Sequence, residues 1–212
     1  MIKGIDISHH NSPIPWDNLS KEVRFVFCKA TQGASYRDPQ FNQNWQYLKK
    51  TDKARGGYHF LTAVDSAQAQ ADNFLSFGVD FSKPNVLPPV LDIEDQVPAS
   101  LNSGITKDKD AFIRLIDDWL VIVEKATGRK PIIYSYKNFF RDYLKDHSWP
   151  HYGLWLASYQ STPPGLPKGY KKADFWQYSQ FGTFSGNIKG GGLDLDYFMG
   201  SEDEFKAISN SI

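Results

Sequence analysis

Short apolar runs alternate with segments of helical apolar periodicity along the first two thirds of the chain. Five runs rich in Ile, Val, Phe and Tyr are typical of buried strands, and they lie at 4–8, 24–31, 55–61, 88–95 and 131–136. After most of these runs, apolar residues return every three or four positions, as Phe41, Trp45 and Leu48 do. We therefore predict five strand–helix units, with helices at 16–22, from 39, from 66, at 106–126 and at 138–146. A loop at 96–104 is expected before the longest helix.

After residue 150 the pattern changes. Three further strands are predicted at 154–159, 174–179 and 193–198, but the segments between them contain Pro and Gly and show no helical period. A closing helix follows at 202–208. Together these elements predict an α/β fold, an irregular TIM-like barrel of five βα units followed by three β strands. The chain contains no repeat and no linker, so we expect one domain over residues 1–212.

The fourth apolar run ends in acidic residues. Side chains alternate along a strand, so Asp92 and Glu94 point the same way, with Cα atoms roughly 6.5 to 7 Å apart. Two carboxyls in one site raise the pKa of at least one of them by repulsion and desolvation, and a raised pKa is what a general acid requires. The other interpretation is that these acids only solvate a loop or cap the next helix.

Aromatic residues make up 15% of the chain, with 6 Trp, 11 Tyr and 15 Phe. That content is more than a core usually needs, and it offers stacking surfaces for sugars or bases. Lys and Arg together number 24, as do Asp and Glu, so the formal net charge is zero and no basic stripe stands out. The composition therefore disfavours nucleic-acid binding.

Cysteine content and the first residues exclude other classes. Cys28 is the only cysteine, so an intrachain disulfide cannot form, and its apolar neighbours predict a buried thiol rather than a nucleophile. No cluster of Cys and His has metal-ligand spacing, and we predict no metal and no other cofactor. Met1 leads directly into the first strand without a signal-peptide pattern, and no run is long enough to span a membrane. Localisation stays open, since export by another route and earlier removal of a signal are both compatible with this start.

Polar and aromatic side chains gather at the predicted strand ends, on the face of a barrel where catalytic groups stand. They are Asp6, Lys29, Tyr58, His59, Asp92, Glu94, Tyr134, Tyr136, Trp176, Gln177, Asp194 and Asp196. Several acids among aromatic residues describe a site that binds a sugar chain and protonates a glycosidic oxygen. The alternative is a set of oxygen ligands for a divalent cation, which would not need the aromatic residues.

Eight segments carry a longer pattern, at 4–9, 25–33, 57–60, 89–94, 133–135, 154–159, 175–179 and 193–198. In their residues and their order they resemble the segments of glycoside hydrolase family 25, the Chalaropsis-type lysozymes. The resemblance covers nearly the whole chain. It implies a barrel of five βα units and three β strands, and hydrolysis of the β-1,4 bond between N-acetylmuramic acid and N-acetylglucosamine in peptidoglycan.

The resemblance also implies roles for individual residues. Glu94 matches the general acid of the family, and Asp92 matches the carboxylate that stabilises the cationic transition state. Asp6 and Asp194, which it places at the ends of the first and last strands, match the two remaining acids of the cleft. The implied substrate contacts are the aromatic residues Tyr58, Tyr134 and Trp176, with Lys29 nearby. His59 is a further candidate contact, and it is equally well interpreted as a residue of the core or of the layer behind the site. The chain departs from the family pattern at Gln32, where Glu is frequent, and at Asp196, where Asn is frequent.

Two rival functions remain open at this point. A chitinase-like glycosidase is one, although the longer acidic run of that family before its catalytic Glu is absent here. A non-catalytic module that binds peptidoglycan is the other, and the presence of all the matching acids argues against it. The expected partner is the glycan strand of peptidoglycan, and we predict no obligate protein partner. Retaining and inverting mechanisms both remain possible, as do the settings of a phage lysin, a secreted lysozyme and an injected toxin.

Overall fold

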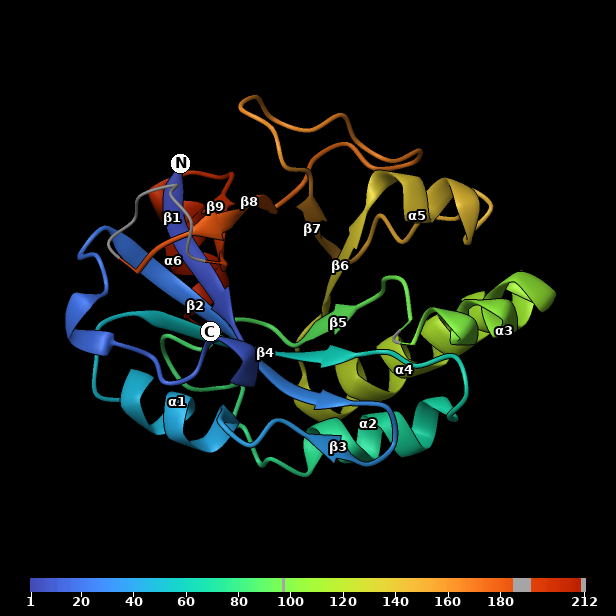
Figure 1. Cartoon of the computed structure of the whole chain (residues 1–212), viewed down its shortest axis with the longest axis horizontal. Coiled ribbons are helices and arrows are strands. Elements are labelled where there is room, and N and C mark those ends of the chain that lie inside the picture. Colours follow the sequence, from blue (N-terminus) through green and yellow to red (C-terminus); the bar gives the residue numbers. More distant parts are fainter. Residues whose placement is uncertain (97, 185–191, 211–212) are drawn as a thin grey trace.

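Eight strands close into a barrel in the computed structural model, which describes residues 1–96, 98–184 and 192–210 (Figure 1). Strand β1 pairs with β2 on one side and with β9 on the other, and these two pairings close the sheet. The predicted irregular TIM-like barrel is therefore confirmed. The barrel strands are β1 (Ile2–Ile7), β2 (Val23–Gln32), β4 (Ala54–Phe60), β5 (Val90–Asp92), β6 (Ile132–Tyr136), β7 (Gly153–Ala157), β8 (Phe175–Gly182) and β9 (Leu193–Phe198).

Strand direction is uniform except at β9. Strands β1, β2, β4, β5, β6, β7 and β8 are parallel to their neighbours in that order, whereas β9 runs antiparallel to both β8 and β1. The amino end of β9 therefore lies at the same rim as the carboxyl ends of the other strands. A further short strand, β3 (Tyr36–Arg37), pairs antiparallel with the end of β2 and was not predicted.

Helices follow most strands, as the apolar periodicity predicted. Helices α1 (Phe41–Leu48) and α2 (Ala67–Leu75) contact β2, and α2 packs beside the long α4 (Lys109–Thr127). In Figure 1 they lie on the outer side of this part of the barrel. The remaining helices are α3 (Asn102–Lys107), α5 (Lys137–Asp142) and α6 (Glu202–Ser209), with 3₁₀ turns η1 (His9–Asn11), η2 (Trp16–Asn18) and η3 (Ala99–Leu101).

Two connections differ from the expectation. The predicted loop at 96–104 contains η3 and the start of α3, and the predicted helix at 16–22 is only the 3₁₀ turn η2. Residues 100–103 contain one apolar side chain, that of Leu101, and one such residue cannot display the apolar period of a helix. Of the predicted connection between the strands at 174–179 and 193–198, residues 185–191 lie outside the described residues.

Aromatic rings fill the amino-terminal half of the barrel interior. The Phe25 ring lies 5.2 Å from that of Phe175, and the Phe27 ring stacks at 4.5 Å on Trp155. Phe205 of α6 belongs to the same cluster, with its ring 5.3 Å from Phe198, so α6 closes this end of the barrel. The packed floor leaves the polar residues at the opposite rim as the accessible part of the interior. No helix among the described residues is long and apolar enough to cross a membrane.

Candidate active site

A polar cavity of about 180 Å³ opens at the carboxyl-end rim of the barrel. Residues from seven barrel strands, and from the segments that follow two of them, line it, as expected for the face where barrel enzymes carry their sites. The lining residues are Asp6, Tyr58, Asp92, Glu94, Tyr134, Trp155, Tyr159, Gln177, Gln180 and Asp194. The cavity thus brings together the four acids singled out in the sequence with Tyr58 and Tyr134.

Strand alternation turns these side chains inward. Asp92 is the last residue of β5, and Glu94 follows two positions later on the same side, so both reach the cavity. Asp6 lies directly opposite Asp194 in the antiparallel pairing of β1 with β9. Asp194 is the second residue of β9 and not at its carboxyl end as predicted. It reaches the rim because β9 runs in the reverse direction.

Gln177 connects the rim tyrosines to Asp6. Its amide Nε2 donates to Asp6 Oδ2 at 2.8 Å, while its Oε1 accepts from the hydroxyls of Tyr134 at 2.8 Å and Tyr159 at 3.0 Å. This set of donors and acceptors determines the orientation of the amide. The predicted strand ends included Gln177 but gave it no role, and they did not include Trp155, Tyr159 or Gln180. The strand pattern indicates where such residues lie but not which of them meet across the barrel.

Beneath Asp6 lies a second, fully buried acid, Asp196. Its Oδ1 accepts from the indole Nε1 of Trp155 at 2.9 Å. No N–H or hydroxyl group of the described residues donates to its Oδ2. Burial raises the pKa of Asp196 well above its usual range, and the charge of Asp194 adds to this. Burial likewise raises the pKa of Asp6, with Asp194 and then Asp196 adding to it. Two neighbouring buried carboxyl groups therefore hold one proton between them more readily than they both ionise.

The Asp92 and Glu94 pair carries the same kind of perturbation. Burial raises the pKa of Glu94 to about 7, and the positive charge of Lys29 opposes that rise. Burial also raises the pKa of Asp92 well above its usual range, with the charge of Glu94 adding to the effect. Burial raises the pKa of Asp194, across the cavity, to about 6. A carboxyl group in this site can therefore stay protonated near neutral pH.

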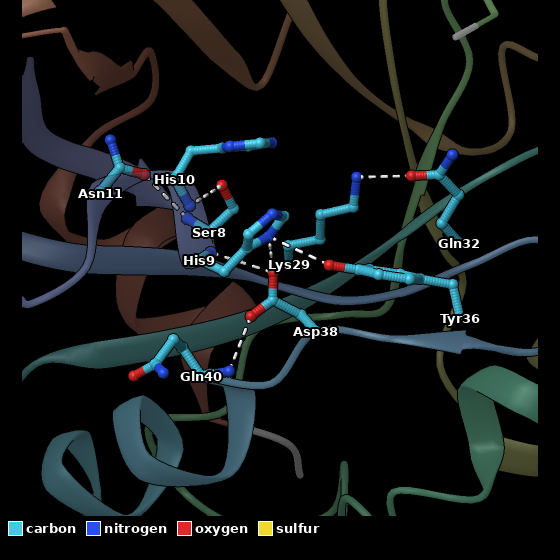
Figure 2. Close-up of polar contacts among 9 residues, drawn as sticks. All are labelled: Ser8, His9, His10, Asn11, Lys29, Gln32, Tyr36, Asp38 and Gln40. Atoms are coloured by element: carbon cyan, nitrogen blue, oxygen red, sulfur yellow. Dashed lines mark hydrogen bonds and ion pairs between the residues drawn. The ribbon is translucent and has the colours of Figure 1, made fainter. Parts of the chain in front are cut away.

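Lys29 stands beside the cavity rather than in its lining, paired in the sheet with Tyr58. Figure 2 shows its ammonium group pointing to Gln32, whose Oε1 accepts from Lys29 Nζ at 2.8 Å. The same ammonium lies 4.9 Å from the centre of the Phe60 ring. Because Gln32 is neutral, this contact leaves the positive charge of Lys29 uncompensated, and that charge acts on both Asp92 and Glu94.

A histidine and an aspartate tie the end of β1 to the β3 hairpin (Figure 2). Asp38 is buried, and its Oδ2 contacts both the backbone N–H of His9, at 3.0 Å, and the ring Nδ1 of His9, at 2.8 Å. The hydroxyl of Tyr36 lies 3.1 Å from the same ring nitrogen. These contacts hold the loop after β1 against the hairpin next to Lys29.

Two predicted substrate contacts lie elsewhere. His59 is fully buried behind β4, where Thr31 Oγ1 lies 2.7 Å from its Nδ1 and Gln70 Oε1 lies 3.2 Å from its Nε2. Both ring nitrogens are thus occupied, and burial lowers the pKa of His59 to about 4. The structure therefore places His59 in the core and outside the cavity lining, where the alternative interpretation put it.

Trp176 is also outside the cavity. It precedes the inward-facing Gln177 in β8, so alternation turns it to the outer face, where its Nε1 donates to the carbonyl of Ser158 at 2.8 Å. There it lines a separate hollow with Tyr178 and Tyr197. The indole in the cavity is that of Trp155. Among the described residues, no group of three or more His, Cys, Asp or Glu is arranged to hold a metal ion.

Comparisons with known proteins agree with this geometry. The family model for glycosyl hydrolases family 25 matches residues 5–187. Over 217 residues the chain is 31% identical to Lysozyme M1 of Streptomyces globisporus, covering 99% of this chain and 72% of that protein. Over 207 residues it is 30% identical to the N,O-diacetylmuramidase of a Chalaropsis species, covering 91% of this chain and 96% of that one.

The fold points to the same family. The structure of a family 25 glycosyl hydrolase from Bacillus anthracis matches with a TM-score of 0.85 at 31% identity, covering 99% of this chain and 94% of that one. The family match includes Asp6, Asp92 and Glu94, and the structural match extends to Asp194. The chain therefore belongs to glycosyl hydrolase family 25 and is a glycoside hydrolase.

Proposed function

We propose that this glycoside hydrolase is a lysozyme, an N-acetylmuramidase that cleaves the β-1,4 bond between N-acetylmuramic acid and N-acetylglucosamine in bacterial peptidoglycan. The observation that carries the proposal is the rim cavity with Glu94, whose pKa is raised to about 7, facing Asp92. Relatives named as a lysozyme and as a diacetylmuramidase, each about a third identical over most of the chain, support the choice of substrate.

Glu94 is proposed as the general acid. Protonation of the glycosidic oxygen needs an acid that holds its proton near neutral pH and can reach the bond from the cavity wall. Glu94 meets both needs, because burial raises its pKa and its side chain lines the cavity. The nearby positive charge of Lys29 keeps the pKa from rising so far that the proton cannot leave.

Asp92 is proposed to stabilise positive charge that develops at the sugar carbon. With one proton shared between Asp92 and Glu94, the pair presents one acid and one carboxylate, and these are the two charge states that the step needs. A carboxylate in this position can also orient the 2-acetamido group of the substrate, whose carbonyl oxygen can attack the anomeric carbon. An inverting attack by water is the alternative route.

Asp6 and Asp194 are proposed to complete the site from the opposite wall. They face each other across β1 and β9, and Gln177 holds Asp6 in place. Their oxygens suit hydrogen bonds to sugar hydroxyl or amide groups. Tyr58 and Tyr134 line the same cavity and are proposed to contact the sugar rings.

The test is digestion of purified peptidoglycan by the wild-type protein and by Glu94→Gln. We expect new reducing ends that mass spectrometry identifies as muramic acid, and a loss of at least about 100-fold in rate for the variant, since general acid catalysis contributes that much. The matched control is Asp95→Asn. Asp95 is the next acid along the chain, but it is outside the cavity and accepts from Tyr136 and Asn102.

The outcomes separate the functions clearly. Muramic acid ends from the wild type and from Asp95→Asn, but not from Glu94→Gln, support the proposal. Reducing N-acetylglucosamine ends would make the protein a glucosaminidase instead. An absence of new ends across several wall types, with chitin cleaved, would favour the chitinase-like activity.

A further inference from the structure

A second cavity, away from the rim, lies between helix α1 and the segment 77–86 that leads to β5. Its volume is about 440 Å³. Arg55, the second residue of β4, lines it, so this cavity is near the amino ends of the strands and not at their carboxyl ends. Much of the wall is apolar, formed by Phe41, Trp45, Phe77, Val79 and Val86.

Arg55 is the unusual feature of this cavity. The residue is only 7% exposed, yet none of its side-chain N–H groups donates to a described residue, and its Nε is buried without a partner. No described carboxylate forms an ion pair with it, and desolvation by burial accounts for the lowering of its pKa. An arginine normally has hydrogen-bonded or charged partners when it is buried, because an uncompensated charge is costly away from water.

One contact holds the guanidinium group in position. Its central carbon lies 5.5 Å from the centre of the Trp45 ring, at cation–π distance. Such a contact offsets part of the desolvation cost, but it uses none of the N–H donors. The donors therefore remain available to a ligand, and their fork geometry matches a carboxylate or a phosphate.

The other charged groups of the cavity also favour an anion. Lys49 of α1 and Lys83 contribute two more positive charges to the lining. Asp80 is the only acid among the lining residues, and it lies 3.4 Å from Lys83 in an ion pair. Three cations against one paired acid leave a positive field in an apolar cavity.

We propose that this cavity is a second binding site, for a small organic anion with a carboxylate or phosphate head and an apolar body. The head accepts from the guanidinium of Arg55, and the body packs against Trp45 and Phe77. The site is independent of the proposed hydrolysis, because its lining shares no residue with the rim cavity. The aromatic walls select against a bare inorganic ion and in favour of a ligand with a flat or aliphatic part.

Calorimetric titration of the folded protein with benzoate, and separately with inorganic phosphate, tests this site. We expect saturable binding of benzoate, and we expect Arg55→Met to weaken it by at least about tenfold, since hydrogen bonds to charged groups carry that much affinity. Arg55→Lys, which keeps the charge but not the fork, is expected to bind with intermediate affinity. The matched control is Arg24→Met, because Arg24 also lies over an aromatic ring, that of Phe205 at 5.9 Å, but is exposed, and neither residue belongs to the lining.

The possible results divide as follows. Benzoate binding that is lost in Arg55→Met and kept in Arg24→Met supports the site, and comparison with phosphate identifies the preferred head group. If Arg55→Met does not fold, weaker benzoate binding by Arg55→Lys than by Arg24→Met supports the site. Absence of saturable binding by the wild type, or equal binding by Arg55→Met, overturns the proposal. Peptidoglycan digestion by Arg55→Met is expected to match that of the wild type whenever the variant folds.

Discussion

Burial of Glu94 affects the stability of the fold as well as its chemistry. The pKa of Glu94 is about 7 in the folded chain and about 4.5 when exposed, so the folded state binds the proton more tightly. Stability from this group is fully present below pH 4.5 and is lost as the pH rises through 7, by up to about 3 kcal/mol. Glu94→Gln is therefore expected to be more stable than wild type at pH 8 and equal to it at pH 4. Urea unfolding at the two pH values measures the difference, and an equal difference at both would contradict the assignment.

The same pKa predicts the basic limb of activity. A general acid works only while protonated, so kcat/KM is expected to fall about tenfold per pH unit above pH 7. The measurement is the pH profile of peptidoglycan digestion at low substrate. If kcat/KM instead falls from near pH 5, where an exposed Glu titrates, burial does not determine the pKa of the general acid.

Asp196 shows how a buried acid can be tolerated beneath the site. Asp196→Asn keeps an acceptor for the Trp155 indole and removes a charge near Asp6, so we expect stability at pH 8 equal to or above wild type. Asp196→Ala leaves the indole N–H without its acceptor and is expected to cost about 1–3 kcal/mol. Urea unfolding of both variants is the measurement. If the Asn variant loses as much as the Ala variant, the carboxylate charge itself stabilises the site.

At the scale of elements, the ring of Phe27 in β2 occupies the space that a side chain on Gly56 of β4 would need. A Cβ on Gly56 of β4 would lie 2.3 Å from the Phe27 ring inside the barrel. We expect Gly56→Ala to lose about 1–3 kcal/mol or more by overpacking. Gly104→Ala in α3 is the control, because its nearest atom would be 3.9 Å away and a helical Ala gains about 0.5–1 kcal/mol. Thermal unfolding of the pair checks this, and equal effects would contradict the packing argument.

For the whole molecule, the balance of charges governs long-range attraction. With 24 basic and 24 acidic residues the formal net charge is zero, so steering toward an anionic wall is weak. We expect kcat/KM on peptidoglycan to change by less than about threefold between low and physiological salt, where the Debye length shortens to about 8 Å. A change of an order of magnitude would indicate a local charged surface that dominates binding.

Much of the barrel was predictable because its strands are short, apolar and separated by helical periods. Alternation alone placed Asp92 and Glu94 on one side of their strand, and the cavity contains both. The short helical turns at 99–107 and the β3 hairpin were missed, since so few residues cannot display a period. The inward position of Gln177 and the outward position of Trp176 follow from alternation once one face is known.

By itself, the sequence determined the succession of strands and helices along the chain, the buried runs and the acids that lie in or just after them, because hydrophobic period and side-chain alternation are local properties of the chain. Only the tertiary structure decided which face of each strand lines the barrel and which way β9 runs. As a result, His59 lies in the core, the amino end of β9 with Asp194 lies at the rim, and Asp196 lies beneath Asp6. The physical reason is that contacts between distant strands depend on how the sheet closes, and closure leaves no periodic signal in any one strand.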